Sequence, residues 1–164
     1  MSDAVLRGRM TAEADGNVVV FLIGMRINRF RAVRAWLPVF RAMLRMLREL
    51  AAEPAHGLLA HRLLLSGPRE FAVIQYWECA DKLLSYASAG DAEHRPAWAA
   101  FNRRARAADG AVGVWHETYV VPAGSREAIY IDMPRYGLAA AYPAVPVKSG
   151  RDRAAQRLGA GAEA

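Results

Sequence analysis

The stretch from Arg69 to Glu117 carries the side chains best able to do chemistry. It holds His94 and His116, and an imidazole can accept or donate a proton near neutral pH. It also supplies three large aromatic side chains that could wall a small-molecule pocket: Trp77, Trp98 and Trp115. This combination predicts a general base, His94 or His116, beside a small hydrophobic or aromatic ligand. The alternative is that both histidines are core residues.

Few polar groups accompany these aromatic residues. Arg26 and Asn28 end an apolar run, where they could hold an oxyanion at a pocket mouth. Glu117 lies among aromatic residues, so its carboxylate needs a hydrogen-bond partner or a raised pKa. The predicted substrate-binding residues are Arg26, Asn28, Trp77, Trp98, Trp115, Glu117 and Tyr119.

Several function classes are disfavoured by the sequence. Cys79 is the single cysteine, so no cysteine pair supports a structural zinc site, and we predict no metal ligands. There is no Gly-x-Ser-x-Gly nucleophile motif and no Gly-Lys-Ser/Thr phosphate loop. The net charge is +6, but the arginines are spread along the chain, which favours a solvated surface over nucleic-acid binding. No apolar run reaches the roughly 18 residues of a membrane helix, and we expect a cytoplasmic protein.

Length and composition predict one domain. The chain has 164 residues, 54% of them apolar, which is enough for a sizeable core. We expect an N-terminal extension over residues 1–16, a single domain over 17–140 and a flexible tail over 141–164. The run from Asn17 to Ile27 reads as a strand that is apolar on both faces, and such a strand must be covered on both sides.

Turn signals and periodicity divide the rest of the domain into elements. We expect the main helix to start at about Leu37 or Pro38, since proline suits the first turn of a helix, and to end near Ala52. Gly67-Pro68 indicates a hairpin turn. The other expected elements are strands over residues 57–66, 69–78, 112–121 and 128–133, and helices over 80–89 and from 91 or 96 to 108.

The spacing within these elements distributes the chemical groups. In the strand over 112–121, His116 shares a face with apolar residues, while Trp115, Glu117 and Tyr119 share the other. His94 and Trp98 are four residues apart, so they share one face of a helix.

The order strand, helix, strand, strand, helix, strand predicts an α+β fold of the ferredoxin-like, split βαβ type. Its helices lie on one face of an antiparallel sheet, which leaves the other apolar face uncovered. A second copy of the chain would cover that face, so we expect a homodimer that forms a dimeric α/β barrel. Residues 124–137 would be an arm onto the partner.

Several short motifs together resemble a known family. They are Gln75-Tyr76-Trp77, His94-Arg95-Pro96-Ala97-Trp98, Trp115-His116-Glu117-Thr118-Tyr119, Trp36-Leu37-Pro38 and the strand from Val19 to Arg26. The sequence is similar over residues 8–140 to DUF4188, a family of dimeric α/β-barrel proteins with a monooxygenase-like member in fumagillin biosynthesis.

This resemblance implies a monooxygenase like those of antibiotic biosynthesis, which acts on a small hydrophobic substrate without a bound metal or flavin. Two alternatives stay open. One is a haem b protein similar to aldoxime dehydratases, in which His94 would be the axial ligand. The other is a dimer that binds a small ligand without catalysis.

Overall fold

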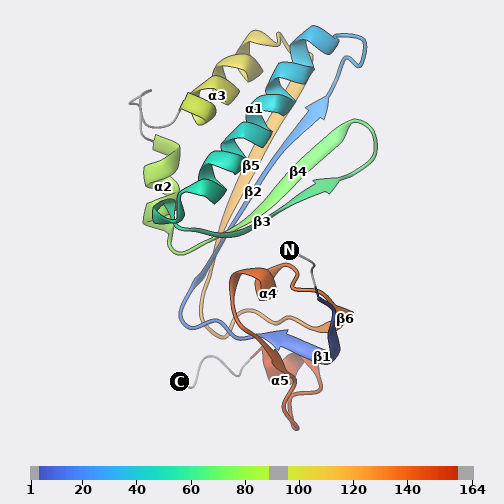
Figure 1. Cartoon of the computed structure of the whole chain (residues 1–164), viewed down its shortest axis with the longest axis vertical. Coiled ribbons are helices and arrows are strands. Elements are labelled where there is room, and N and C mark those ends of the chain that lie inside the picture. The colour runs from blue at the N-terminus through green and yellow to red at the C-terminus, as the bar shows by residue number, and fades with distance from the viewer. Residues whose placement is uncertain (1–3, 89–95, 159–164) are drawn as a thin grey trace.

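The computed structural model describes residues 4–88 and 96–158, and its larger part is a four-stranded antiparallel sheet (Figure 1). The strands follow the order β3-β4-β2-β5, and every neighbouring pair is antiparallel. Their bounds are Val18–Ile27 for β2, Leu58–Leu65 for β3, Glu70–Trp77 for β4 and Val112–Val121 for β5. This is the predicted α+β, ferredoxin-like arrangement, and four of the five predicted strands form this sheet with ends within one residue of those predicted.

Three helices cover one face of this sheet (Figure 1). They are α1 (Val33–Ala52), α2 (Ala80–Ser88) and α3 (Pro96–Ala107), and a short 3-10 helix, η1 (Pro54–His56), follows α1. The core lies between α1 and β2, where Phe21, Ile23 and Met25 pack with Met43 and Met46. Each of these side chains is at most 5% exposed. Alternate residues of β2 therefore face the helices, as period-two geometry requires.

The main helix begins earlier than predicted. It starts at Val33, and Pro38 lies inside it instead of at its first turn. Pro38 is the sixth residue of the helix, and because proline has no N–H it removes one intrahelical hydrogen bond. The indole N–H of Trp36 donates to the carbonyl oxygen of Phe30 over 3.0 Å and ties this start to the preceding loop.

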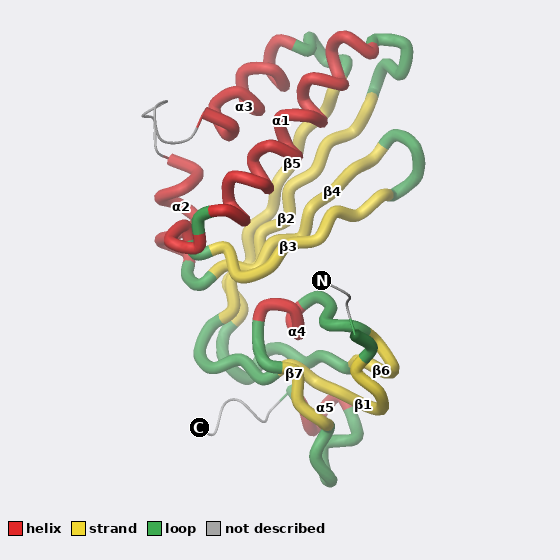
Figure 2. The backbone as a smooth tube through the Cα atoms, viewed as in Figure 1, coloured by secondary structure: helices red, strands yellow, loops and turns green. Residues whose placement is uncertain are grey.

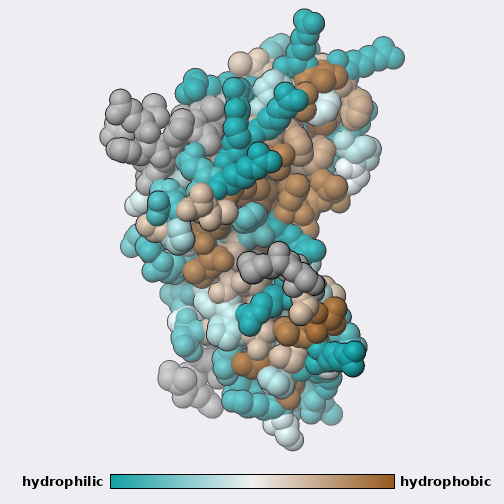
Figure 3. Space-filling view, in the orientation of Figure 1, coloured by the Kyte–Doolittle hydropathy of each residue, from teal (hydrophilic) through white to brown (hydrophobic). Residues whose placement is uncertain are grey.

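The outer side of α1 is polar. Arg41, Arg45 and Arg48 are all exposed, which confirms the predicted solvated stripe. Figure 3 shows hydrophilic side chains projecting from this helix and hydrophobic ones gathered beside it, over β3 and β4. Phe40 of α1 and Phe71 of β4, which are partly buried against the core, have ring centres 4.8 Å apart.

A second, smaller sheet joins segments from both ends of the chain (Figure 2). It has the order β6-β1-β7, with β1 at Leu6–Ala12, β6 at Tyr130–Met133 and β7 at Ala144–Pro146. Two short helices accompany it, α4 (Leu138–Ala141) and α5 (Ala154–Arg157). The sequence analysis foresaw neither β1 nor β7. Strand β1 is short, contains two arginines, and has an irregular register between Leu6 and Arg9 around Gly8, so its pattern does not alternate.

The segment expected to form an arm instead pairs within its own chain. Residue Met133 of β6 is opposite Leu6 of β1, and Tyr130 is opposite Met10. Within residues 124–137, strand β6 therefore pairs with the N-terminal strand of its own chain.

On its second face, here called the open face, the four-stranded sheet carries residues 135–140, which include part of α4, over β3 and β4. On this open face, β5 exposes 42% of Trp115 and 49% of Tyr119. The Trp115 indole lies against Gly24 of β2, and a Cβ atom added at Gly24 would be 2.5 Å from its Nε1. The absent side chain of Gly24 thus makes room for the ring. The sheet of the single chain does not close into a barrel.

Candidate functional site

The structure distributes the predicted site residues over three places. Trp77 is opposite Val19 and His116 is opposite Ile23. Since Val19 and Ile23 belong to the core under the helices, Trp77 and His116 lie on the helix-covered face of the sheet. Trp115, Glu117 and Tyr119 lie on the open face. The third place is the far end of β2.

That far end holds the two groups proposed for an oxyanion. Arg26 Nε pairs with Glu70 Oε1 over 2.9 Å and its Nη1 donates to Asn28 Oδ1 over 3.4 Å. Asn28 Nδ2 donates to the carbonyl oxygen of Gly110. Trp77 is opposite Val19, which is seven residues from Arg26 along β2. Seven residues of a strand span about 23 Å. The structure therefore does not bring these polar groups to the tryptophan.

The most distinctive polar group on the helix-covered face is Gln75. It is 1% exposed, and Trp77 beside it is also 1% exposed. The Trp77 indole N–H donates to Gln75 Oε1 over 2.9 Å, while Nε2 of the same amide has no hydrogen-bond partner in the described part of the chain. A buried donor without a partner costs about 1–3 kcal/mol, and such groups are rare enough to require an explanation.

An apolar slot surrounds this amide between the sheet and helices α1 and α2. Besides Gln75 and Trp77, its lining comprises Phe21, Met46, Leu50, Leu83, Tyr86 and Ala87. The slot is narrow: it does not admit a water molecule.

Tyr86 brings a second polar group to the slot. Its ring centre is 5.8 Å from that of Trp77, and its hydroxyl lies 3.4 Å from Oε1 of Glu49 on α1. Helices α1 and α2 are therefore linked by a hydrogen bond at the wall of the slot.

His116 lies next to the slot on the same face. Its ring centre is 5.7 Å from that of Phe21, and Phe21 is directly opposite Gln75 in the β2–β4 pair. Phe21 therefore contacts both the imidazole and the slot. His116 is exposed, since β5 is an edge strand. It is not the core histidine that the alternative interpretation required.

The two remaining predicted site residues are His94 and Trp98. His94 is outside the described residues. Trp98 belongs to α3, but its side chain is outside the described part of the structure.

Glu117 on the open face has a hydrogen-bond partner. Tyr119 donates its hydroxyl to Glu117 Oε2 over 2.8 Å. This hydrogen bond, together with the negative charge, raises the pKa of Tyr119. The expectation that Glu117 needs a partner is therefore met by its neighbour on the same strand face.

Gln75 belongs to the motif Gln75-Tyr76-Trp77, but it was not predicted as a site residue. The signal was present, because Val73, Gln75 and Trp77 alternate onto one face of β4, and a single amide between apolar residues on a buried face is unusual. Glu49 and Tyr86 carried no comparable signal, because they come from two helices whose packing the sequence does not show.

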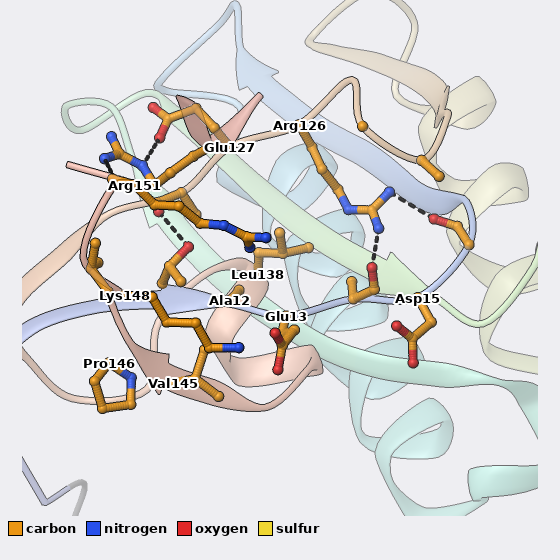
Figure 4. A pocket seen from close by; sticks show the side chains of 18 residues that line it. Ala12, Glu13, Asp15, Arg126, Glu127, Leu138, Val145, Pro146, Lys148 and Arg151 are labelled. Carbon is orange, nitrogen blue, oxygen red and sulfur yellow. Dashed lines mark hydrogen bonds and ion pairs between the residues drawn. The ribbon is translucent and has the colours of Figure 1, made fainter. Parts of the chain in front are cut away.

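A larger cavity, of about 580 Å³, lies in the smaller sheet region (Figure 4). Much of its charge holds chain segments together: Arg126 donates to the carbonyl oxygens of Ala14 and Gly16, and Arg157 pairs with Glu127 over 2.8 Å. None of the predicted site residues that the structure describes lines it. We therefore place the candidate site at the slot around Gln75.

The described residues contain no group of three or more His, Cys, Asp or Glu side chains placed to hold a metal ion. No helix among them has the length and apolar character needed to cross a membrane.

Comparison with known families places this geometry in context. The model of the Monooxygenase af470-like family matches residues 18–138, which include all of the main sheet and the whole slot. The chain belongs to this family. None of the curated proteins matches the chain significantly.

Solved structures with similar chains are distant. SnoaB, a cofactor-independent oxygenase from Streptomyces nogalater, is 20% identical with a TM-score of 0.39, covering 65% of this chain and 92% of SnoaB. A conserved protein of unknown function from Bacteroides thetaiotaomicron is 15% identical with a TM-score of 0.40, covering 65% and 99%. A dimeric ferredoxin-like protein from an uncultured marine organism is 9% identical with a TM-score of 0.37, covering 65% and 96%.

Proposed function

We propose that this member of the Monooxygenase af470-like family oxidises a small hydrophobic or aromatic substrate in the slot around Gln75. The observation that carries the proposal is Nε2 of Gln75, a donor that has no partner among the described residues and lies dry between apolar walls. Such a donor is worth most where negative charge develops on a bound molecule, because water does not screen it.

The chemistry requires a base and an electron-rich substrate. His116 would remove a proton from a methylene group activated by a neighbouring carbonyl, and the resulting carbanion would reduce O₂ and form a carbon–oxygen bond. The O–O bond then breaks, so that the methylene becomes a carbonyl and the second oxygen atom leaves as water with the two hydrogens. Gln75 Nε2 would donate to the anionic oxygen in this sequence.

In this scheme the substrate supplies all the electrons, so we propose that no resident metal, flavin or haem takes part. The slot does not fit a haem, because it does not admit even a water molecule. Even a small substrate would require the side chains of α2 to move away from Trp77.

We also propose that a second copy of the chain covers the open face and forms the homodimer of an α/β barrel. The support is the exposed aromatic surface of β5, which includes Trp115 and Tyr119. Aromatic side chains exposed together on one sheet face are typical of an interface.

Oxygen uptake by the purified protein tests the proposed reaction. With anthrone, a tricyclic ketone that has an activated methylene, we expect one O₂ consumed per quinone formed, unchanged after dialysis against EDTA and without added flavin. Gln75→Leu should lower kcat by about 10²-fold, the effect of losing one oxyanion donor. Thr118→Val, on the same sheet face, is the matched control and should retain the parent kcat.

Two outcomes would replace the proposal. Oxygen uptake no faster than in buffer across a panel of activated ketones and phenols, with binding of the same compounds retained, would favour the ligand-binding dimer. A stoichiometric Soret band in the purified protein, lost in His94→Ala, would favour the haem protein.

A further inference from the structure

A separate cavity of about 340 Å³ lies on the opposite side of the sheet from the slot, between strands β3 and β4 and residues 135–140. Tyr76 of β4 lines it, whereas its chain neighbour Gln75 lines the slot, because successive strand residues point to opposite faces. The lining includes Arg62, Arg135, Tyr136 and His61, and none of the described residues in it is an aspartate or a glutamate. The cavity therefore offers cationic and hydrogen-bonding groups without a competing carboxylate.

Arg62 lies over an aromatic ring of the same cavity. Its guanidinium carbon is 4.0 Å from the centre of the Tyr136 ring. A guanidinium that stacks on an aromatic ring keeps its N–H edge available, and this edge matches a carboxylate with two parallel hydrogen bonds. Neither Arg62 nor Arg135 has an ion pair with a carboxylate in residues 4–88 and 96–158.

Two phenol hydroxyls lie close to the backbone of Gly137, that of Tyr76 in the cavity lining and that of Tyr130 outside it. A Cβ atom at Gly137 would be 3.4 Å from the hydroxyl oxygens of both Tyr76 and Tyr130. Gly137 has a φ of 56°, which a residue with a side chain rarely adopts. Burial raises the pKa of Tyr76, so its hydroxyl keeps its proton and remains a donor.

We propose that this cavity binds a small aromatic carboxylate, whose carboxylate pairs with Arg62 and Arg135 and whose ring packs against Ile74 and Tyr76. A volume of about 340 Å³ is at the lower end of the range for small-ligand sites, which selects a ligand of one or two rings. The site is distinct from the proposed oxygenation slot, since the sheet separates them.

Calorimetric titration of the full chain with benzoate tests this assignment, with benzamide as the uncharged analogue of the same shape. We expect benzoate to bind at least tenfold more tightly than benzamide. Arg62→Gln should weaken benzoate binding by about tenfold or more, the scale of a charge-assisted pair of hydrogen bonds. Arg41→Gln, which makes the same charge change on the outer side of α1, should bind benzoate like the parent.

Further variants separate this site from the slot and from a loss of folding. Gln75→Leu should leave benzoate binding unchanged, and Tyr136→Leu should weaken it, with the far-ultraviolet circular dichroism of both variants equal to that of the parent. Equal affinities for benzoate and benzamide, parent-like binding by Arg62→Gln, or no heat from benzoate and indole-3-carboxylate up to about 10 mM would overturn the proposal.

Discussion

The indole N–H of Trp77 donates to Oε1 of Gln75 over 2.9 Å, and this hydrogen bond decides which end of a buried amide is left for a ligand. The carbonyl and amino ends of glutamine have nearly the same shape, so only the hydrogen-bond network distinguishes them. Since Trp77 can only donate, Nε2 must be the free end. An adjacent structural residue thus prepares a donor in a site that excludes water.

Trp77→Phe tests this preparation directly. The variant keeps an aromatic ring but leaves Gln75 Oε1 without its donor, which should lower the free energy of unfolding by about 1–3 kcal/mol. It should also lower kcat at least tenfold with less change in KM, because the amide is no longer held in one orientation. Chemical denaturation and oxygen-uptake kinetics measure the two effects.

Trp36→Phe provides the matched control, since it also removes one indole hydrogen bond, at the exposed start of α1. It should keep the parent kcat. If Trp77→Phe loses stability but retains full turnover, the amide orientation has no role in the reaction.

His116→Ala separates a catalytic histidine from a structural one. Because the imidazole is exposed on an edge strand, its loss should change the melting temperature little. Turnover should fall by roughly 10²-fold, the scale of a lost general base. A variant that melts at a much lower temperature and turns over normally would show that the contact with Phe21 is the only role of this residue.

Trp115→Arg tests the homodimer. The parent should have about twice the chain mass of 18.0 kDa by light scattering after gel filtration. Placing a charge on the exposed aromatic surface of β5 should shift the variant to the monomer mass, because burial of an unpaired guanidinium is costly. Leu65→Arg, on the exposed end of the β3–β4 hairpin, is the control and should remain dimeric. A parent protein of single-chain mass would remove the proposed interface.

The sequence predicted the main sheet and its faces well, for a physical reason. Strands β2 and β5 are long and rich in β-branched residues, and their alternation follows from local geometry alone. The two faces of β5, with His116 on one and Trp115 on the other, were therefore predicted and are confirmed by the register with β2.

The sequence could not predict which site residues meet. Arg26 and Trp77 were grouped by chemistry, but the register places them at opposite ends of β2, and register depends on long-range pairing. The small sheet was missed for a related reason. Thr11 of β1 is opposite Val145 of β7, a pairing between the two ends of the chain that leaves no local signal.

The last prediction concerns His61, whose pKa burial lowers from its ordinary value of 6.5. Because the pKa of His61 is lowered only in the folded chain, the unfolded chain takes up a proton at this residue at a higher pH than the folded chain does. Stability should therefore fall as the pH decreases through 6.5 toward the folded-state pKa, with no further effect below it. In His61→Gln, the difference in melting temperature between about pH 8 and about pH 5 should be smaller than in the parent. Titration of the parent by nuclear magnetic resonance, with the His61 signal assigned from its absence in the variant, gives the direct measurement. A titration midpoint at or above 6.5 would contradict the argument, because burial would then not disfavour the charged imidazole.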